Sequence, residues 1–231
     1  MYGSTRQHLI FDADDTLWEN NIYFDDAFDR FCAYLAHSSM KSEQIRAVLD
    51  EIETVNAGIN GYGCRSFARN LTTCFQHLAE REISQGDVDA VMEFGNTILE
   101  SPLKLLPGVD ETLAELSQRH ELTLFTKGDP EEQQRKIDRS GLARYLHHIA
   151  IVKEKDASAY GRLAQERAFR ADKTWMIGNS PKSDINPALA AGLRAVYVPH
   201  PRTWSLEREP VPDGHPRLLR LESIEELKNY F

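Results

Sequence analysis

Apolar residues follow two different periods along this chain. Short apolar runs occur near the N-terminus and again in the second half, at residues 7–11, 121–126, 147–152, 173–178 and 193–198. Between the first two runs, from Tyr23 to Leu99, apolar residues recur every three or four positions, as in Ile45, Leu49 and Ile52. Short runs between polar turns are typical of buried strands, and a period near 3.6 is typical of amphipathic helices. We therefore predict strands at the runs and helices in the block between them.

The order of these elements predicts an α/β fold with an inserted helical domain. After residue 105 the strand-like runs alternate with helical patterns, which indicates a parallel sheet with crossover helices. The first run is separated from the others by the helical block, so we assign residues 1–17 and 103–231 to the core and 18–102 to the insertion. Residues 217–221 are predicted as an edge strand, followed by a closing helix with Ser223 and Glu226 as a capping box.

The composition of the chain argues against some classes of binding partner. The 231 residues carry a net charge of -9 and show no clustered basic face, which argues against a nucleic-acid partner. No apolar segment approaches the ~20 residues that span a bilayer, so no membrane partner is expected. The three cysteines, Cys32, Cys64 and Cys74, match neither a disulfide framework nor a zinc site. We expect a cytoplasmic protein, a monomer or homodimer, that acts on a small molecule.

Polar residues follow four of the predicted strands at their carboxyl ends. Asp12 and Asp14 follow the first, Thr126 ends the second, two lysines follow the third, and Asn179 and Asp184 follow the fourth. Each residue alone has a structural explanation as a turn, cap or solvated residue. Ligands of parallel α/β sheets bind outside the carboxyl ends of the strands, so we predict that these side chains form one site.

Four segments carry a resemblance to a known family. "LIFDADDTLW", "LFTKGD", "VKEKD" and "IGNSPKSD" resemble, in this order, the four signature motifs of the haloacid dehalogenase (HAD) superfamily of hydrolases. The resemblance covers nearly the whole chain. It implies a Rossmann-like core, and an inserted helical cap between the first and second motifs of the kind typical of small-metabolite phosphatases.

The resemblance also implies catalytic and metal-binding roles for the acidic residues. By resemblance to the first motif, Asp12 is the nucleophile, and Asp14 is the general acid and base. Crowded carboxylates need a compensating cation, and Mg²⁺ prefers oxygen ligands, so Asp12, the backbone carbonyl of Asp14, and Asp184 form a plausible set. Asn179, where many relatives have an acid, is expected beside the metal, and Asp184 has an alternative role as a helix cap. Asp15 is expected to be a turn residue.

Phosphate binding is assigned to the ends of the second and third strands. Thr126 supplies a hydroxyl, and the backbone N–H groups of Lys127 and Gly128 are predicted to form a small anion nest. A lysine must balance the remaining charge, and two compete for this position. The family pattern around "EKD" favours Lys155 over Lys153.

Substrate choice is expected to lie in the insertion. Tyr62 and Arg65, in "NGYGCRSF", are candidates for contacts to the leaving group, while the alternative is that the two glycines of this segment only separate two helices. In "VPHPRTW", His200 or Arg202 could reach the rim of the site, or the segment could be a plain surface loop.

These assignments predict a magnesium-dependent phosphatase of a small phosphorylated metabolite, acting through an aspartyl-phosphate. One alternative is a dehalogenase of short haloacids with the same nucleophile, against which Asp14 and the metal set argue. A second alternative is a catalytically silent member that binds a phosphorylated ligand, which is supported by Asn179 in place of an acid.

Overall fold

The computed structural model describes residues 5–231, which divide into two compact units. The first unit contains the described chain up to Glu19 together with Leu103–Phe231, and the second contains Asn20–Pro102. We call them the core unit and the helical unit.

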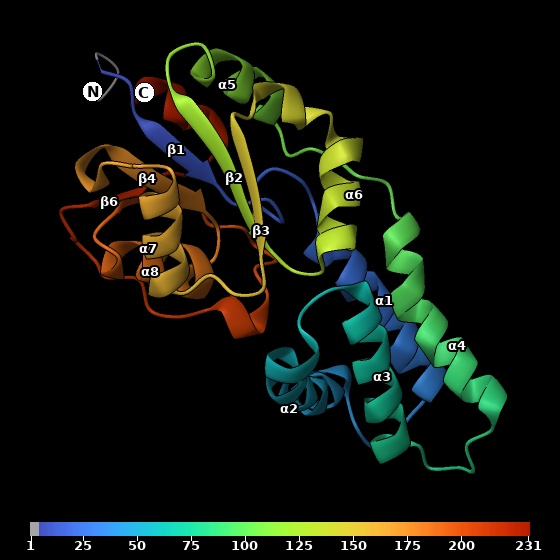
Figure 1. The fold of residues 1–231 in the computed structure, drawn as a ribbon. Helices are drawn as coiled ribbons and strands as arrows, with labels where there is room; N and C mark the ends of the chain where they lie inside the picture. Colours follow the sequence, from blue (N-terminus) through green and yellow to red (C-terminus); the bar gives the residue numbers. More distant parts are fainter. Residues whose placement is uncertain (1–4) are drawn as a thin grey trace. The chain divides into compact units, whose positions relative to one another are not determined.

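The core unit contains a six-stranded parallel sheet with the order β3-β2-β1-β4-β5-β6 (Figure 1). Its strands are β1 (His8–Phe11), β2 (Glu121–Lys127), β3 (His148–Val152), β4 (Thr174–Gly178), β5 (Arg194–Tyr197) and β6 (Leu218–Arg220). The predicted α/β class is confirmed, and each predicted run lies within one residue of an observed strand at both ends. In β1, β2 and β4, residues are buried on both faces, which explains why these strands read as continuous apolar runs rather than as alternating ones.

Helices cover both faces of this sheet (Figure 1). Leu9 and Phe11 of β1 pack into a core with α5 and the closing turn η6, whereas Ile10 packs on the other face with α7 and α8. This division follows from the alternation of side chains along a strand. The helices and helical turns of the unit are α5 (Val109–Leu116), α6 (Pro130–Ser140), η2 (Leu142–Tyr145), α7 (Ala157–Glu166), η3 (Ala171–Lys173), the π-turn η4 (Pro181–Ile185), α8 (Asn186–Ala190), η5 (Ser205–Glu207) and η6 (Ile224–Asn229).

The sheet order brings the predicted motifs together. β1 lies between β2 and β4, and Phe11, the last residue of β1, is in register with Leu124 of β2 and Ile177 of β4. β3 pairs with the outer side of β2. The segments that leave these four strands therefore start from neighbouring positions at one edge of the sheet.

The helical unit confirms the helical block expected between Tyr23 and Leu99. It consists of α1 (Asn21–Leu35), α2 (Ser42–Asn60), α3 (Cys64–Leu78), α4 (Gln85–Asn96) and the 3-10 turn η1 (Thr97–Glu100). Its buried cluster includes Phe31 of α1, Leu49 of α2 and Phe75 of α3. All three cysteines are free thiols on α1 and α3.

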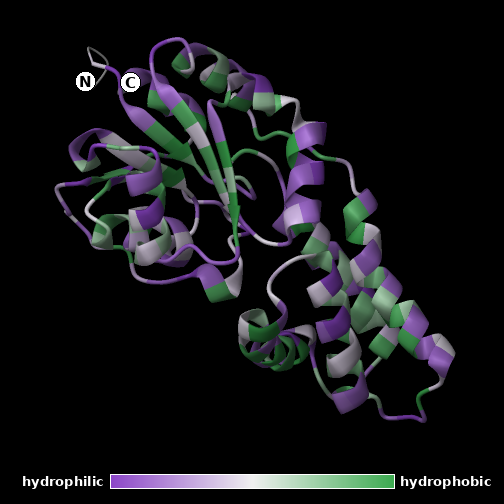
Figure 2. Cartoon of the chain, viewed as in Figure 1, coloured by the Kyte–Doolittle hydropathy of each residue, from purple (hydrophilic) through white to green (hydrophobic). Residues whose placement is uncertain are grey.

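Helix α6 differs from the other helices of the core unit in its polarity. It is mostly hydrophilic (Figure 2), and Ile137 is its buried aliphatic residue. Asp129 starts the helix, because its carboxylate accepts hydrogen bonds from the N–H groups of Glu131 and Glu132, and Pro130 occupies the first turn. Polar side chains of α6 are therefore available to the strand ends beside it.

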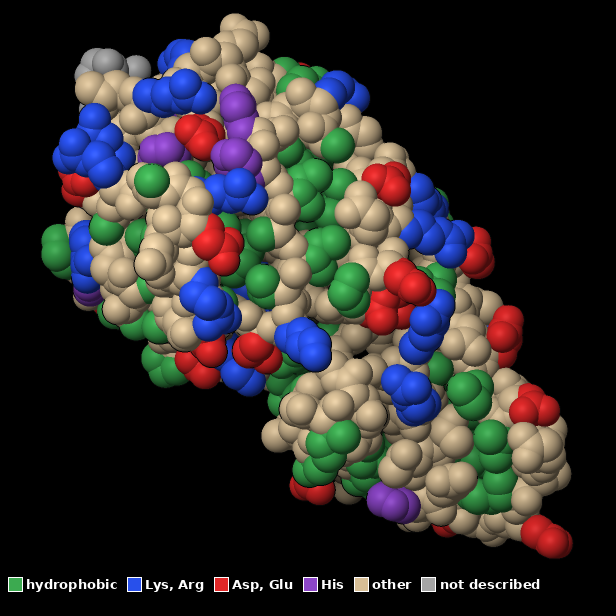
Figure 3. Space-filling view, in the orientation of Figure 1, with side chains coloured by type: hydrophobic (Ala, Val, Ile, Leu, Met, Phe, Trp, Pro, Cys, Tyr) green, Lys and Arg blue, Asp and Glu red, His purple; other side chains and the backbone are tan. Residues whose placement is uncertain are grey.

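The distribution of surface charge and the hydropathy of the helices both concern the expected partners. On the face shown in Figure 3, Lys and Arg side chains are interspersed with Asp and Glu. None of the helices within the described residues is long and apolar enough to cross a bilayer.

The predicted capping box at the C-terminal helix is wrong. The segment forms the 3-10 turn η6, and the Ser223 side chain makes no capping hydrogen bond. The carboxylate of Glu226 instead accepts from the N–H of Glu222, at 3.1 Å. A capping box needs the Glu226 carboxylate to accept from the N–H of Ser223. In the tighter 3-10 turn it reaches the N–H of the preceding residue instead.

Candidate active site

A buried ion cluster lies at the carboxyl edge of the sheet. The ammonium nitrogen of Lys155 lies 2.5 Å from Asp12 Oδ1 and 2.7 Å from Asp184 Oδ1. The side chains of Lys155, Asp12 and Asp184 are 1%, 11% and 0% exposed. Three of the residues predicted from the strand ends are thus brought together, and they come from the segments after β3, β1 and β4.

This cluster has two carboxylates for one ammonium. Burial by itself lowers the pKa of Lys155, but the Asp12 and Asp184 carboxylates outweigh it and hold the pKa above its ordinary value. Burial, together with the nearby charge of Asp12, raises the pKa of Asp184 to about 7. The site therefore has room for one more positive charge, either a proton or a bound cation.

The position of Asp184 is fixed by the turn that follows β4. Its Oδ2 accepts a hydrogen bond from the N–H of Ser180 at 3.0 Å. A Cβ atom on Gly178 would come 2.2 Å from the same oxygen, so this strand must end in glycine. The alternative of Asp184 as a helix cap is wrong, because the Ser180 side chain accepts from the N–H of Ser183 and caps the turn, while Asp184 lies inside it.

Thr16 and Asn179 lie on the other side of Asp12. The Thr16 hydroxyl is 3.0 Å from Asp12 Oδ2 and 3.1 Å from Asn179 Oδ1. Asn179 Nδ2 donates to the hydroxyl of Thr203 at 3.0 Å, which fixes the amide with its oxygen toward Thr16. Asn179 thus contacts the nucleophile candidate through one intervening hydroxyl. Thr16 lies within the first motif, "LIFDADDTLW", but the sequence analysis gave it no role, and it did not single out Thr203.

Asp14 is held by one donor from its own turn and by two donors from α6. Trp18 Nε1 donates to Oδ1 at 2.7 Å, Gln133 Nε2 donates to Oδ2 at 2.9 Å, and Lys136 Nζ lies 2.8 Å from Oδ1. Burial disfavours the charged form of Asp14, but Lys136 and the hydrogen bonds outweigh it and lower the pKa. Asp14 is therefore an anion in this arrangement. Gln133 and Lys136 are on α6, and the sequence analysis missed them.

The end of β2 corrects the predicted anion nest. Thr126 is buried at the end of β2, as the prediction requires. The Gly128 N–H, however, donates to the carbonyl of Val152 at 3.1 Å, so the nest loses one of its two predicted donors. The side chain of Lys127 is also engaged, by Ser183 and Glu207. The parallel pairing of β2 with β3 continues one residue further than expected.

The remaining site candidates are a second lysine of the core unit and two residues of the helical unit. Lys153 is exposed, and Lys155 is the lysine that contacts both carboxylates. Tyr62 and Arg65 belong to the helical unit, where Tyr62 lies between α2 and α3 and Arg65 is exposed on α3. The glycines on either side of Tyr62 have φ angles of 71° and 119°, so they do separate two helices.

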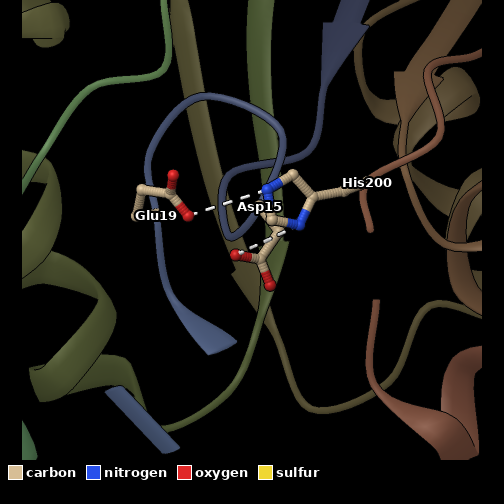
Figure 4. Close-up of side chains that lie close together, drawn as sticks. All are labelled: Asp15, Glu19 and His200. Atoms are coloured by element: carbon tan, nitrogen blue, oxygen red, sulfur yellow. Dashed lines mark ion pairs between the residues drawn. The ribbon is translucent and has the colours of Figure 1, made fainter. Parts of the chain in front are cut away.

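A second polar cluster follows the turn after β1. The side chains of Asp15, Glu19 and His200 point toward one another (Figure 4), and a possible ligand atom of each lies within 4.8 Å of the others. His200 Nδ1 is 3.8 Å from Asp15 and Nε2 is 3.6 Å from Glu19. Burial lowers the pKa of His200, and its Nδ1 accepts from the N–H of Arg202. The segment after β5 is therefore more than a plain surface loop, and His200 contacts the turn after β1.

Comparison with known proteins supports one family. The family profile for haloacid dehalogenase-like hydrolases matches residues 7–192. A solved haloacid dehalogenase-like family hydrolase from Xanthomonas campestris is 30% identical, with a TM-score of 0.84 over 99% of this chain and 95% of that chain.

Other similar proteins are more distant or match in part. The HAD-hydrolase YfnB of Bacillus subtilis, solved bound to magnesium, is 17% identical, with a TM-score of 0.70 over 98% of this chain and 99% of that chain. A 2-haloacid dehalogenase from Pseudomonas syringae is 18% identical, with a TM-score of 0.62 over 97% of each chain. These two likenesses concern the fold.

A phosphoserine phosphatase of Thermus thermophilus is 33% identical over 104 residues, which are 41% of this chain and 40% of that protein. The match thus spans less than half of the relative's length. The family profile covers most of this chain, and the sheet order brings the residues of its motifs to one edge. The chain belongs to the haloacid dehalogenase-like hydrolases.

Proposed function

We propose that this hydrolase is a magnesium-dependent phosphatase of a small phosphorylated metabolite, and that it acts through an aspartyl-phosphate. The observation that carries the proposal is the buried cluster of Asp12, Lys155 and Asp184, in which two carboxylates share one ammonium. An excess of buried negative charge suits a site that binds a dication together with a phosphate group.

The residues present fit a magnesium ion. Carboxylates of Asp12 and Asp184 and the backbone carbonyl of Asp14 would hold it, and all of these are oxygen donors of the kind that magnesium prefers. Burial and the nearby Asp12 charge raise the pKa of Asp184, and a bound cation would offset this repulsion between the two carboxylates. When bound, the ion would neutralise charge on the phosphate oxygens.

The chain's own residues supply the covalent chemistry. A carboxylate oxygen of Asp12 attacks phosphorus, the bond from phosphorus to the leaving-group oxygen breaks, and Asp14 gives that oxygen a proton. Water then attacks the phosphorus of the aspartyl-phosphate and gives its proton to Asp14, which frees Asp12 and inorganic phosphate. Lys155 holds Asp12 in place and the Thr126 hydroxyl binds a phosphate oxygen.

The ionic state of Asp14 matches the second of these steps. Its pairing with Lys136 keeps the carboxylate charged, which is the form that accepts a proton from water. The first step needs the protonated carboxyl, and the pairing with Lys136 disfavours that form.

Asp14 also favours a phosphatase over a dehalogenase. An alkoxide leaving group needs a proton, whereas a halide ion does not, so a second carboxylate has a use in phosphate ester hydrolysis. The partial identity with a phosphoserine phosphatase supports the same choice. The likeness to a dehalogenase is below 25% identity and supports the fold alone.

The test is a hydrolysis screen over sugar, nucleotide, amino-acid and organic-acid phosphates and an aryl phosphate, with and without magnesium. We expect phosphate release that requires magnesium and is abolished in Asp12→Asn, which keeps the shape of the side chain but removes the nucleophile. Release of chloride from 2-chloropropionate without magnesium would support the dehalogenase instead. Tight binding of a phosphorylated compound without turnover would support the silent binder, and normal turnover by Asp12→Asn would reject the nucleophile.

A further inference from the structure

Glu207 connects two of the segments that carry site residues. It lies at the end of η5, in the connection between β5 and β6, beyond the residues that the family profile matches. Its Oε1 is 2.6 Å from the ammonium of Lys127, which follows Thr126 at the end of β2. Its Oε2 accepts from the hydroxyl of Ser180, which follows Asn179 after β4, at 2.5 Å.

This contact is buried and charged. The Glu207 side chain is 9% exposed and the Lys127 side chain is 14% exposed. Lys127 Nζ also donates to the Ser183 hydroxyl at 2.8 Å, so it contacts the η4 turn as well as Glu207. Burial by itself raises the pKa of Glu207, but Lys127 and the serine hydroxyls outweigh it and lower the pKa. The carboxylate therefore stays charged, and a buried charge of this kind is stable only while its partners stay in place.

Ser180 is hydrogen-bonded both to Glu207 and to Asp184. The Ser180 hydroxyl donates to Glu207 and accepts from the Ser183 N–H at 2.9 Å, so its orientation is fixed from both sides. The backbone of Ser180 makes two hydrogen bonds to Asp184: its N–H donates to Oδ2 at 3.0 Å, and its carbonyl accepts from the Asp184 N–H at 2.9 Å. Glu207 is thus two hydrogen bonds away from a carboxylate of the ion cluster.

The same connection makes a second contact of this type. Thr203, four residues before Glu207, accepts from the Asn179 side chain and donates to the carbonyl of His200. Thr203 therefore holds the start of the segment 179–183 through Asn179. Glu207 holds the rest of it through the Ser180 hydroxyl, which is bonded to the N–H of Ser183.

We propose that Glu207 is a positioning residue of the active site: together with Lys127 it holds the segments after β2 and β4 against each other and thereby sets the position of Asp184. The proposal rests on the proposed function, since it assigns Glu207 a part in metal binding by Asp184. Glu207 does not touch the reacting atoms, so it acts through Ser180.

The test uses Glu207→Gln in the full chain. Glutamine keeps the shape but loses the charge that pairs with Lys127, so the η4 turn is held less firmly. Removing an outer partner of a metal ligand costs about 10-fold or more in metal affinity. We expect the magnesium concentration for half-maximal hydrolysis of an aryl phosphate to rise about 10-fold, with a smaller change in kcat at saturating magnesium. Calorimetric titration with magnesium alone should show the same loss of affinity.

Two further variants separate positioning from general stability. Glu209→Gln makes the same chemical change two residues away, on an exposed side chain that contacts Asn186, and should leave all these quantities unchanged. Lys127→Met should repeat the effect of Glu207→Gln. Since the two residues act as one unit, the double variant should be no worse than either single variant.

Backbone amide hydrogen exchange of residues 179–185 decides the proposal without metal or substrate. Exchange should be faster in Glu207→Gln and unchanged in Glu209→Gln. A Glu207→Gln variant with normal magnesium affinity and normal exchange, altered in thermal stability alone, would overturn the proposal. If the wild-type protein hydrolyses no phosphate ester, the proposed function fails, and the exchange measurement still decides the role of Glu207.

Discussion

Each end of the core sheet carries a cluster of three ionisable side chains, and the two clusters differ in composition and in surroundings. At the amino end, Glu121 of β2 accepts a hydrogen bond from His148 of β3 at 2.9 Å and lies 3.5 Å from His8 of β1. These three side chains are 21%, 28% and 22% exposed. At the carboxyl end, Lys155 bridges Asp12 and Asp184, and none of the three side chains is more than 11% exposed.

Parallel pairing explains both clusters, but burial separates them. Residues at the same end of neighbouring parallel strands always lie close together, so a polar residue at each strand end forms a cluster without any further cause. Water screens the charges at the amino end, whereas each charge at the carboxyl end has lost most of its hydration and depends on its partners. Neighbouring ionisable side chains thus occur at both ends of the sheet, and dehydration distinguishes the end to which we assign the chemistry.

The largest effect that follows is for Lys155→Met. Removal of the ammonium leaves two buried carboxylates facing each other, and loss of one partner of a buried ion pair costs about 3–5 kcal/mol. We expect the free energy of unfolding in urea to fall by this amount, and hydrolysis to be lost. The matched control is Lys153→Met, on an exposed side chain two residues away, which should stay within about 0.5 kcal/mol of wild type. Equal effects of the two variants would contradict the weight given to burial of the Lys155 ammonium, since the two lysines lie at the same end of the sheet and differ in exposure.

A smaller effect is expected from Gly178→Ala. The new methyl group would come 2.2 Å from Asp184 Oδ2, so the carboxylate has to move. Overpacking of this kind costs about 1–3 kcal/mol in unfolding free energy, and the displaced Asp184 should bind magnesium more weakly in a calorimetric titration. Gly161→Ala on α7, where the added Cβ would meet nothing within 4 Å, is the control and should be neutral or slightly stabilising. Unchanged magnesium binding in Gly178→Ala would mean that the site tolerates movement of Asp184.

The smallest effect is expected at the amino end, from Glu121→Gln. Burial raises the pKa of Glu121, but the hydrogen bond from His148 and the nearby cationic groups outweigh it, so the pKa lies below the ordinary 4.5. A lowered pKa stabilises the folded protein above the unfolded-state value, and this contribution is lost as the pH falls through the folded-state value. We expect the variant to lose less than about 1 kcal/mol of unfolding free energy at neutral pH. The loss should vanish in acid, and turnover should not change.

If the unfolding free energy lost in Glu121→Gln grew as the pH fell, the pKa of Glu121 would be raised by folding rather than lowered, contrary to the prediction. If Glu121→Gln lost as much unfolding free energy as Lys155→Met, the clusters at the two ends of the sheet would contribute equally to stability.

Much of the fold was predictable because its signals are local. Each strand is a run of apolar residues between polar turns, and the helical block has a regular period, so both could be identified without knowledge of their neighbours in space. The convergence of Asp12, Lys155 and Asp184 also followed, because parallel strands direct their carboxyl ends to one edge.

The contacts that the sequence analysis missed come from residues whose local signal has an ordinary explanation. Gln133 and Lys136 lie three residues apart on a hydrophilic helix, which is the pattern of a solvated face. Ile137, the neighbouring buried residue on α6, is the hint that this side of the helix faces the sheet. Glu207 lies in a charged, proline-rich connection that reads as surface, and the distance in sequence from Lys127 to Glu207 hides their contact.

The wrong prediction of the anion nest has a similar origin. Glycine after a strand is typical of a phosphate-binding loop, but whether its N–H is free depends on the neighbouring strand. Here β3 supplies the Val152 carbonyl, and the N–H of Gly128 joins the ladder.

The hydrogen bond from the Trp18 indole to Asp14, 2.7 Å long, gives this enzyme an intrinsic optical reporter. Indole emission responds to the charge and polarity near its nitrogen, and that nitrogen donates to the carboxylate assigned to proton transfer. Fluorescence of the unlabelled protein can therefore follow events at Asp14 during turnover, with a Trp18→Phe variant to separate this signal from the emission of Trp175 and Trp204.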